Sequence, residues 1–207
     1  MSNTQVPRRG RPAKPAGGPE MAAFVEAMWA VTARECSVEP SVRDIVAEAG
    51  LTPKAFYRHF ATKDELLVFA LHQGSEKLTE HLHRRMQRHP PGREQIEAWI
   101  RGVAGQASTA EALRRTLPWS LAMGRLGRDF PAEVAANQAM VIAPLEEQIR
   151  VEIDAGRSSS PDAAADARVV FSAATDLLRR SLLAGRAAKP QEVAHLVDFT
   201  RRALGLG

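Results

Sequence analysis

Side chains that could bind a phosphate backbone gather in one short stretch in the first third of the chain. Lys54, Tyr57, Arg58 and His59 lie within six consecutive positions and offer ammonium, phenol, guanidinium and imidazole groups. Groups of this kind donate hydrogen bonds to the phosphate oxygens of nucleic acids. Phe56 lies among them and is expected to point to the opposite side of a helix. The stretch therefore predicts a face that binds nucleic acid.

The residues around this stretch carry the start and stop signals of two short helices. Ser41 followed by Asp44 forms a capping box, in which the hydroxyl accepts from a backbone N–H and the carboxylate reaches back. Gly50 suits the left-handed conformation that ends a helix. Thr52 is the next N-cap, and Pro53 takes the first helical position, where its missing N–H costs nothing. We expect two short helices around a tight turn.

Longer helices are predicted on both sides of this pair. Thr62 and Glu65 form a second capping box, which starts a helix that should run to about Arg88. Pro19 to about Glu35 has the spacing of an amphipathic helix, on which the short pair should pack. Two short helices around a turn are typical of a helix-turn-helix, whose second helix enters the DNA major groove.

The stretch also closely resembles the DNA-binding end of the TetR family of transcriptional regulators. The resemblance runs from about Met21 to Leu71 and is carried by S-V-R-D-I at 41–45, A-G at 49–50, Y-R-H-F at 57–60 and T-K-D-E-L-L at 62–67. It implies a homodimer that binds a palindromic operator in double-stranded DNA and most often represses, until a small-molecule effector releases it. Cys36 and Ser37 depart from the family pattern, which has a glycine and then an aromatic residue there.

Docking of the helix-turn-helix assigns a role to individual residues. Hydroxyl, imidazole and ammonium groups should hold the DNA backbone, whereas arginine suits a bidentate contact with guanine and small apolar groups suit a thymine methyl. The residues expected at the backbone are Ser41, Thr52, Tyr57, His59 and Lys63. The residues expected at base edges are Arg43, Pro53, Lys54 and Ala55.

The N-terminal residues 1–18 form a separate basic segment. They contain four arginines or lysines and no acidic residue, and they are rich in proline and glycine, which predicts a disordered arm. The sequence R-G-R-P at 9–12 resembles the core of an AT-hook, because an extended Arg-Gly-Arg is slim enough for a narrow minor groove. Arg9 and Arg11 are therefore candidates for minor-groove contact, and a merely solvated basic tail is the alternative.

The composition is that of a soluble globular protein. The 207 residues are 44% hydrophobic and 25% charged, with a formal net charge of +4. Cys36 is the single cysteine, so the chain has no internal disulfide and no thiolate metal cluster, in agreement with a reducing cytoplasm. We interpret Cys36 as a small buried hydrophobe.

Metal sites, secretion and membrane insertion find no support in the sequence. His81 and His83 are two positions apart and point to different helix faces, so no metal site and no cofactor are predicted. The segment Pro15–Glu20 interrupts a possible signal peptide, and no apolar run approaches the roughly 20 residues of a membrane span. A cytoplasmic location is expected.

The remainder of the chain is helical in pattern and lacks strand alternation. Helices are expected at about Arg93–Gln106, at Ala110–Leu117 with a broken continuation to Arg128, at Pro131–Ala155, at Pro161–Ala184 and from Pro190 to about Leu204. The predicted fold is all-α. It comprises the arm at 1–18, a DNA-binding domain at 19–70, and a helical ligand-binding and dimerisation domain at 71–207.

The last two predicted helices carry wide apolar faces. The resemblance to the TetR family implies that these two helices pack against the same two helices of a second chain and form a four-helix interface. Small residues would let the helices approach closely. Two reading heads held one DNA turn apart could then read a palindrome. The predicted interface consists of Val170, Ala173, Ala174, Leu177, Leu178, Leu196 and Phe199. The alternative is that these faces close the core of a single chain.

Large apolar side chains gather in the middle helices, around the segment that Pro118 and two glycines are expected to make irregular. Aromatic-lined cavities between helices suit small apolar ligands. The predicted lining consists of Trp99, Trp119, Met123, Phe130 and Met140. Ordinary core packing is the alternative reading of each of these residues.

These observations favour a ligand-responsive DNA-binding regulator. An all-α interaction protein without specific DNA binding is the alternative, although such a protein has no evident use for the basic face of the second short helix. The sequence shows no nucleophile–base spacing, phosphate-binding loop or metal cluster that would support an enzyme.

Overall fold

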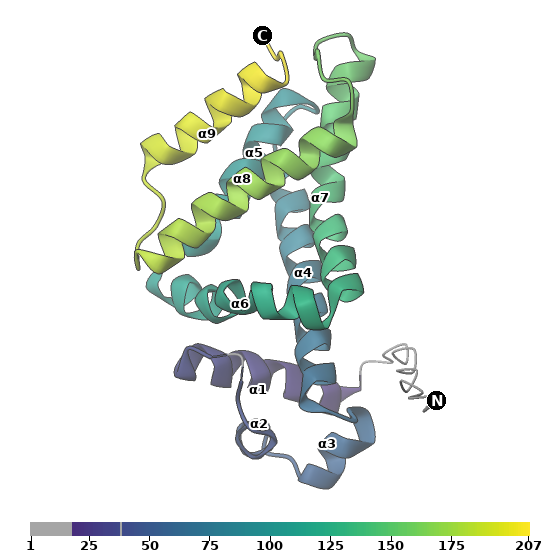
Figure 1. Ribbon diagram of the computed structural model, residues 1–207, viewed down its shortest axis with the longest axis vertical. Coiled ribbons are helices and arrows are strands. Elements are labelled where there is room, and N and C mark those ends of the chain that lie inside the picture. Colours follow the sequence, from purple (N-terminus) through teal and green to yellow (C-terminus); the bar gives the residue numbers. More distant parts are fainter. Residues whose placement is uncertain (1–17, 38) are drawn as a thin grey trace, which may run out of the picture.

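The computed structural model describes residues 18–37 and 39–207, which fold into helices joined by short turns (Figure 1). No strand occurs in these ranges, which confirms the predicted all-α class. Residues 1–17 of the predicted basic arm, with Arg9 and Arg11, lie outside the described residues. The helices are α1 (Pro19–Glu35), α2 (Val42–Glu48), α3 (Pro53–His59), α4 (Lys63–Met86), α5 (Arg93–Ala104), α6 (Ala110–Asp129), α7 (Pro131–Asp154), α8 (Ala163–Leu183) and α9 (Pro190–Ala203), with a 3-10 turn η1 (Gly105–Ala107) after α5.

The N-terminal helices form a small unit at one end of the molecule, which we call the head: α1, α2, α3 and the first turns of α4 (Figure 1). Its core joins side chains at helical spacing from each of these elements, among them Phe24, Ile45, Phe56 and Leu66, all fully buried. The two short helices are therefore held by burial against α1 and α4, because seven residues are too few for either to be stable alone.

The second packing unit, which we call the body, consists of α5, α7, α8, α9 and the last turns of α4. Trp99 lies at its centre with no exposed surface, and its indole N–H donates to the carbonyl oxygen of Val141 on α7 at 3.2 Å. Apolar side chains of α8 and α9, including Leu177 and Val197, close the other side of the same core.

Helix α4 connects the two units without interruption. Leu66 and Leu67 near its start belong to the core of the head, whereas Leu82 and Met86 near its end belong to the core of the body. The boundary predicted between residues 70 and 71 therefore falls inside a continuous helix. Gly74 lies within this helix and does not interrupt it.

Helix α6 corrects the prediction of a broken segment after Leu117. It is continuous from Ala110 to Asp129, with Pro118 inside it. A proline inside a helix removes one backbone hydrogen bond. Here Pro118 is buried together with Trp119, Ala122 and Leu126, and this burial of one face offsets the missing bond. Helix α6 lies across the molecule between head and body (Figure 1).

Two further local expectations are corrected. Helix α8 starts at Ala163 rather than Pro161, because the side chain of Asp162 accepts from the backbone N–H of Ala165 at 3.0 Å and caps the helix there. Cys36 is exposed rather than buried, and it ends α1 in the left-handed conformation, with φ 51°. It thus has the backbone geometry that a glycine would adopt most easily.

Replacing Cys36 with glycine should stabilise the protein. A left-handed conformation costs a residue with a Cβ about 1–2 kcal/mol, and the greater freedom of glycine in the unfolded chain returns part of that. We expect a net gain of about 0.5–1 kcal/mol in the free energy of unfolding, measured by urea denaturation. Cys36→Ala, which removes the thiol and keeps the Cβ, is the control. A Cys36→Gly protein less stable than Cys36→Ala would contradict this account.

Candidate nucleic-acid interface

The caps predicted from the sequence position α2 and α3. The Ser41 hydroxyl oxygen accepts from the backbone N–H of Asp44 at 3.1 Å, and Asp44 Oδ2 accepts from the backbone N–H of Ser41 at 3.1 Å. Gly50 turns the chain with φ 65°. Thr52 Oγ1 then accepts from the backbone N–H of Ala55 at 3.2 Å. These bonds fix both ends of the turn, so the angle between the two helices is set locally.

One face of α3 is anchored in the head. The rings of Phe24 and Phe56 meet edge to face, with centroids 5.5 Å apart, and Phe60 packs on Phe24 from the end of the helix. Ala55 belongs to this inner face and is 7% exposed. Its expected contact with a base edge is therefore wrong, because the Cβ of Ala55 packs in the core of the head and cannot reach a thymine methyl.

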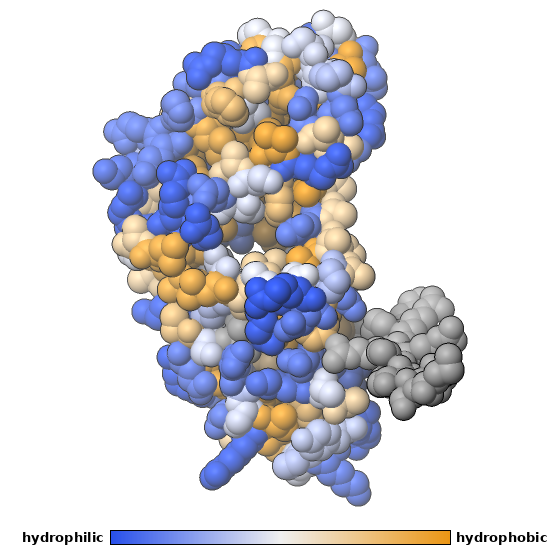
Figure 2. All heavy atoms as spheres, in the orientation of Figure 1, coloured by the Kyte–Doolittle hydropathy of each residue, from blue (hydrophilic) through white to orange (hydrophobic). Residues whose placement is uncertain are grey.

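The opposite face of α3 and the start of α2 are open. The Tyr57 side chain is 60% exposed, and the other exposed residues predicted at DNA are Ser41, Arg43, Thr52, Pro53 and Lys54. Lys63 is half-buried at the first position of α4. Among the described residues, none forms a hydrogen bond or ion pair with the ammonium group of Lys54 or Lys63. Figure 2 shows hydrophilic side chains over much of this end of the molecule.

Glu20 is a functional neighbour that the sequence analysis missed. Glu20 Oε2 lies 2.6 Å from His59 Nε2 and also accepts from the guanidinium of Arg58. These hydrogen bonds, that from Arg58 first, lower the pKa of Glu20 below its ordinary value of 4.5. His59 is thus held by α1, which competes with its predicted role at the DNA backbone. No local signal could reveal a contact between residues 39 positions apart.

Arg125 of α6 holds this helix to the head by ion pairs. Its guanidinium lies 3.5 Å from the carboxylate of Glu39, before α2, and 3.9 Å from that of Asp64, in the first turn of α4. Asp129 on its own helix is the third acidic neighbour, at 3.6 Å. The orientation of α6 is therefore coupled to both ends of the helix-turn-helix.

The predicted ligand-lining residues are distributed over two cores. Trp99 is buried in the core of the body, whereas Trp119, Met123 and Phe130 pack in or against the core of the head. Met140 is half-buried on α7. The expected shared cavity is therefore corrected: α6 is continuous and turns its apolar face toward α1. Two hollows among the described residues are lined by other side chains.

Most of the predicted dimer interface is core of a single chain. Val170, Ala174, Leu177, Leu178 and Leu196 are buried between α8, α9 and the rest of the body, and Ala173 is half-buried. The prediction that these five residues form a dimer interface is therefore corrected. An apolar helix face can be recognised in the sequence, but the sequence does not show which neighbour covers it. Phe199 remains exposed, as do Val169 and Leu183 of α8.

No metal centre or membrane span is found in the described part of the chain. Its His, Cys, Asp and Glu residues do not form any group of three or more that could hold a metal ion. Its helices include none that is both long enough and apolar enough to cross a membrane.

Glu20→Gln should destabilise the protein in a pH-dependent way. The pKa of Glu20 is depressed in the folded state, so the stabilisation it gives is complete above about pH 4.5 and is lost as the pH falls through the lower folded-state pKa. The variant should therefore unfold more easily than wild type at pH 7, and the difference should narrow in acid. Urea denaturation of both proteins, at pH 7 and in acid below pH 4.5, measures the difference in the free energy of unfolding.

The matched control is Glu26→Gln, which removes the same charge from α1 but breaks only an exposed ion pair with Lys77. If the two variants respond to pH alike, Glu20 does not act through Arg58 and His59.

Sequence comparison places the helix-turn-helix among bacterial regulators. Residues 39–68 match the profile of "Bacterial regulatory proteins, tetR family". The chain is 40% identical over 59 residues to the HTH-type transcriptional regulator PksA of Bacillus subtilis (strain 168). This match spans 28% of the present chain and 29% of PksA, so it covers much less than two thirds of that relative.

Structural comparison extends the similarity over most of the chain. FadR of Bacillus subtilis, in complex with stearoyl-CoA, superposes with a TM-score of 0.72 at 14% identity, over 90% of this chain and 99% of that one. A tetR-family regulatory protein from Rhodococcus RHA1 gives a TM-score of 0.67 at 19% identity, over 92% and 100%. Escherichia coli NemR gives 0.69 at 12% identity, over 89% and 97%.

The matched segment includes the caps of α2, α3 and α4 and the exposed face of α3, and the similarity in fold includes the body as well. The chain therefore carries a helix-turn-helix of the TetR family, within the fold of TetR-family regulators.

Proposed function

We propose that the protein is a sequence-specific DNA-binding transcriptional regulator, a repressor that a small-molecule effector releases from its operator. The observation that carries the proposal is the open face of the head. Lys54, Tyr57 and Lys63 point away from the core on a firmly anchored helix-turn-helix, and the two ammonium groups have no partner among the described residues. Free cations on a rigid element suit phosphate binding, because counterions released from DNA supply much of the affinity.

Individual contacts follow from the direction of each side chain. Thr52 uses its oxygen to accept from Ala55, which leaves its O–H to donate to a phosphate. Tyr57 and Lys63 are proposed to hold the backbone on either side of α3. Arg43 and Lys54, exposed near the starts of α2 and α3, are proposed to reach base edges in the major groove.

Arg9 and Arg11 of the N-terminal arm are proposed to add contacts in the adjacent minor groove. Their segment contains no acidic residue and precedes α1 in the sequence. A narrow minor groove concentrates negative potential and so attracts arginine.

A homodimer is proposed to bring two heads to one operator. The outward faces of α8 and α9 expose Val169 (60%), Leu183 (56%) and Phe199 (49%), which is apolar surface that a second copy could cover. Two recognition helices of a dimer must lie about 34–36 Å apart to enter successive major grooves. The spacing of the heads is then the quantity that a ligand has to change.

The effector is proposed to bind in the body. FadR, which shares the fold, was crystallised in complex with stearoyl-CoA. An effector releases DNA only if it binds the DNA-free arrangement more tightly, since differential affinity alone shifts a population. Helix α4, continuous from the head to the body, and α6, bound to the head through Arg125, are the proposed connections.

The first test is fluorescence anisotropy of the full-length protein on labelled duplexes that tile the DNA beside its own gene, with excess random DNA as competitor. Binding to one tile that survives competition is the expected result and would supply the operator. Weak binding that the competitor removes equally from every tile would contradict the proposal and favour an all-α interaction protein.

Substitutions on the open face should separate affinity from specificity. Tyr57→Ala and Lys63→Ala should each cost about 1 kcal/mol of binding on every sequence. Lys63→Ala should also reduce the slope of log affinity against log salt by about 0.9 for each phosphate that the variant no longer neutralises. Arg43→Ala and Lys54→Ala should instead reduce the preference for the operator.

Arg88→Ala is the matched control for these measurements, because Arg88 is exposed beyond the other end of α4 and its removal changes the net charge equally. An equal effect of Arg88→Ala and Lys63→Ala would show that only the total charge matters.

Phe199→Asp should weaken the proposed dimer. A carboxylate placed in an apolar interface loses its hydration without gaining a partner. Sedimentation velocity should show a shift toward monomer, and anisotropy should show a parallel loss of operator affinity. Leu121→Asp is the control, since Leu121 is 56% exposed on α6, away from α8 and α9 in sequence. A Phe199→Asp protein that sediments like wild type would exclude this face.

A further inference from the structure

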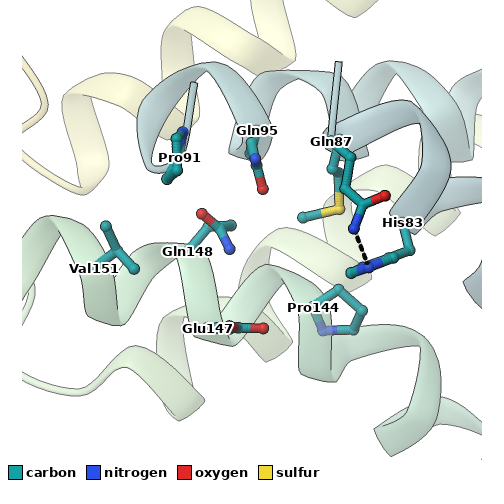
Figure 3. A pocket seen from close by; sticks show the side chains of 9 residues that line it. His83, Gln87, Pro91, Gln95, Pro144, Glu147, Gln148 and Val151 are labelled. Atoms are coloured by element: carbon teal, nitrogen blue, oxygen red, sulfur yellow. Dashed lines mark hydrogen bonds between the residues drawn. The ribbon is translucent and has the colours of Figure 1, made fainter. Parts of the chain in front are cut away.

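A groove at the end of the body distant from the head is lined by side chains of α4, α5, α7 and the α4–α5 turn (Figure 3). Its volume is about 330 Å³. None of the residues expected from the sequence to contact a ligand lines it. Pro91, Pro144 and Val151 give the groove apolar walls. Two glutamines, Gln95 and Gln148, face each other across its middle (Figure 3).

The orientation of both glutamine amides is fixed by the main chain. Gln148 Oε1 accepts from the backbone N–H of Gly92 at 2.9 Å, and Gln95 Nε2 donates to the carbonyl oxygen of His89 at 3.0 Å. A backbone N–H can only donate and a carbonyl can only accept. Neither amide can therefore be flipped without losing its bond to the main chain.

These bonds leave one free end on each glutamine. Gln148 presents its Nε2 amino group, a donor, and Gln95 presents its Oε1 carbonyl, an acceptor, and neither atom has a partner among the described residues. Both side chains belong to residues that are about nine-tenths buried, with 9% of Gln95 and 8% of Gln148 exposed. Polar atoms in such positions normally find a partner in the protein, in water or in a ligand.

We propose that this groove binds a small planar ligand with an amide edge, in which an N–H lies next to a carbonyl. The ligand N–H would donate to Gln95 Oε1, and the ligand carbonyl would accept from Gln148 Nε2. Lactams, cyclic imides and nucleobases carry this edge, and the prolines and Val151 suit the faces of a flat ring. A site built to pair both groups rejects an analogue that lacks one of them.

The size of the groove limits the ligand to one or two rings. Its volume lies near the lower end of the range of about 300–1,000 Å³ that is usual for ligand sites. A long acyl chain such as that of the stearoyl-CoA in complex with FadR does not fit a groove of about 330 Å³. Glu147, exposed at the rim, could accept one further N–H from the ligand.

The regulatory part of the proposal rests on the proposed function. Gln148 holds Gly92 and Gln95 holds His89, so both glutamines fix the turn that follows α4. A ligand that binds both side chains therefore acts on the end of α4, and the beginning of α4 carries Lys63 at the DNA-binding face. Binding of the ligand to the groove does not itself depend on DNA.

The test is saturation-transfer NMR on the full-length protein, with 2-pyridone, uracil and hypoxanthine as probes. N-methyl-2-pyridone and 1,3-dimethyluracil, which lack the N–H, are the matched negative probes. We expect signals from at least one of the three probes and binding at least about tenfold weaker for its N-methylated form. No transfer to any of the three probes would overturn the proposal.

Two variants locate the site. Gln148→Glu keeps an oxygen that accepts from Gly92 and replaces the free donor by an acceptor, so the fold should persist and probe binding should fall at least about tenfold. Val151→Phe should block the groove sterically without touching either amide. Gln138→Glu, the same change at an exposed position of α7, should bind like wild type. Undiminished binding by both Gln148→Glu and Val151→Phe would place the probes elsewhere and exclude this groove.

Anisotropy on the operator distinguishes the failure of either proposal. Operator binding by a protein that takes up none of the probes would leave the proposed function standing and remove the groove as an amide site. The opposite outcome is a protein that shows no operator preference but binds a probe, with the binding lost in Gln148→Glu. It would leave the amide site standing and contradict the proposed function.

Discussion

The position of the head depends on one aromatic contact. Trp29 of α1 stacks on Trp119 of α6, with ring centroids 4.4 Å apart and planes inclined by 33°. Trp29 also lies against Gly74, where a Cβ would come within 2.6 Å of the indole Cζ2 atom. The absence of a side chain at Gly74 therefore allows α1 to approach α4, and α6 covers the indole. Helices α1, α4 and α6 thus meet at a single side chain.

The contact between Trp29 and Trp119 is stabilising, but it leaves one buried hydrogen-bond donor unpaired among the described residues. An aromatic pair contributes about 0.5–1.5 kcal/mol beyond its buried area. The Trp119 Nε1 atom, however, is buried and has no hydrogen-bond partner in the described part of the chain, which costs about 1–3 kcal/mol. The cost of the unpaired N–H therefore offsets the aromatic term, whereas the burial of Trp119, which is 5% exposed, remains as net stabilisation of the contact. The ion pairs of Arg125 with Glu39 and Asp64 hold the other end of α6 against the head.

The sequence predicted what local chemistry determines. Caps at Ser41, Thr52 and Thr62 act over three or four residues, and the starts of α2, α3 and α4 follow them. It failed where the partner comes from a distant segment. The continuity of α6 depends on burial of Pro118 and its neighbours, which local helix propensity does not record.

The same limit applies to surfaces. An apolar stripe on α8 is visible in the sequence, but whether α5, α9 or a second chain covers it is decided by the fold. Ala55 is a similar case, because small size suits both a close contact with a base and a buried helix face. Glu20 escaped notice because an acidic residue in the first turn of a helix is ordinarily explained by the helix dipole. Only its distance to His59 shows that it neutralises part of the basic surface.

In the proposed function, helix α4 transmits movement from the body to the head. Its 24 residues extend about 36 Å at about 1.5 Å per residue, from Lys63 at the DNA-binding face to the turn held by Gln95 and Gln148. A tilt of about 5° about one end of a rod of this length displaces the other by about 3 Å. The two heads of a dimer would each move, and a spacing that must match one turn of DNA tolerates little change. In the proposed function, a rigid helix is therefore sufficient to convert a small tilt in the body into a shift of this size at the head.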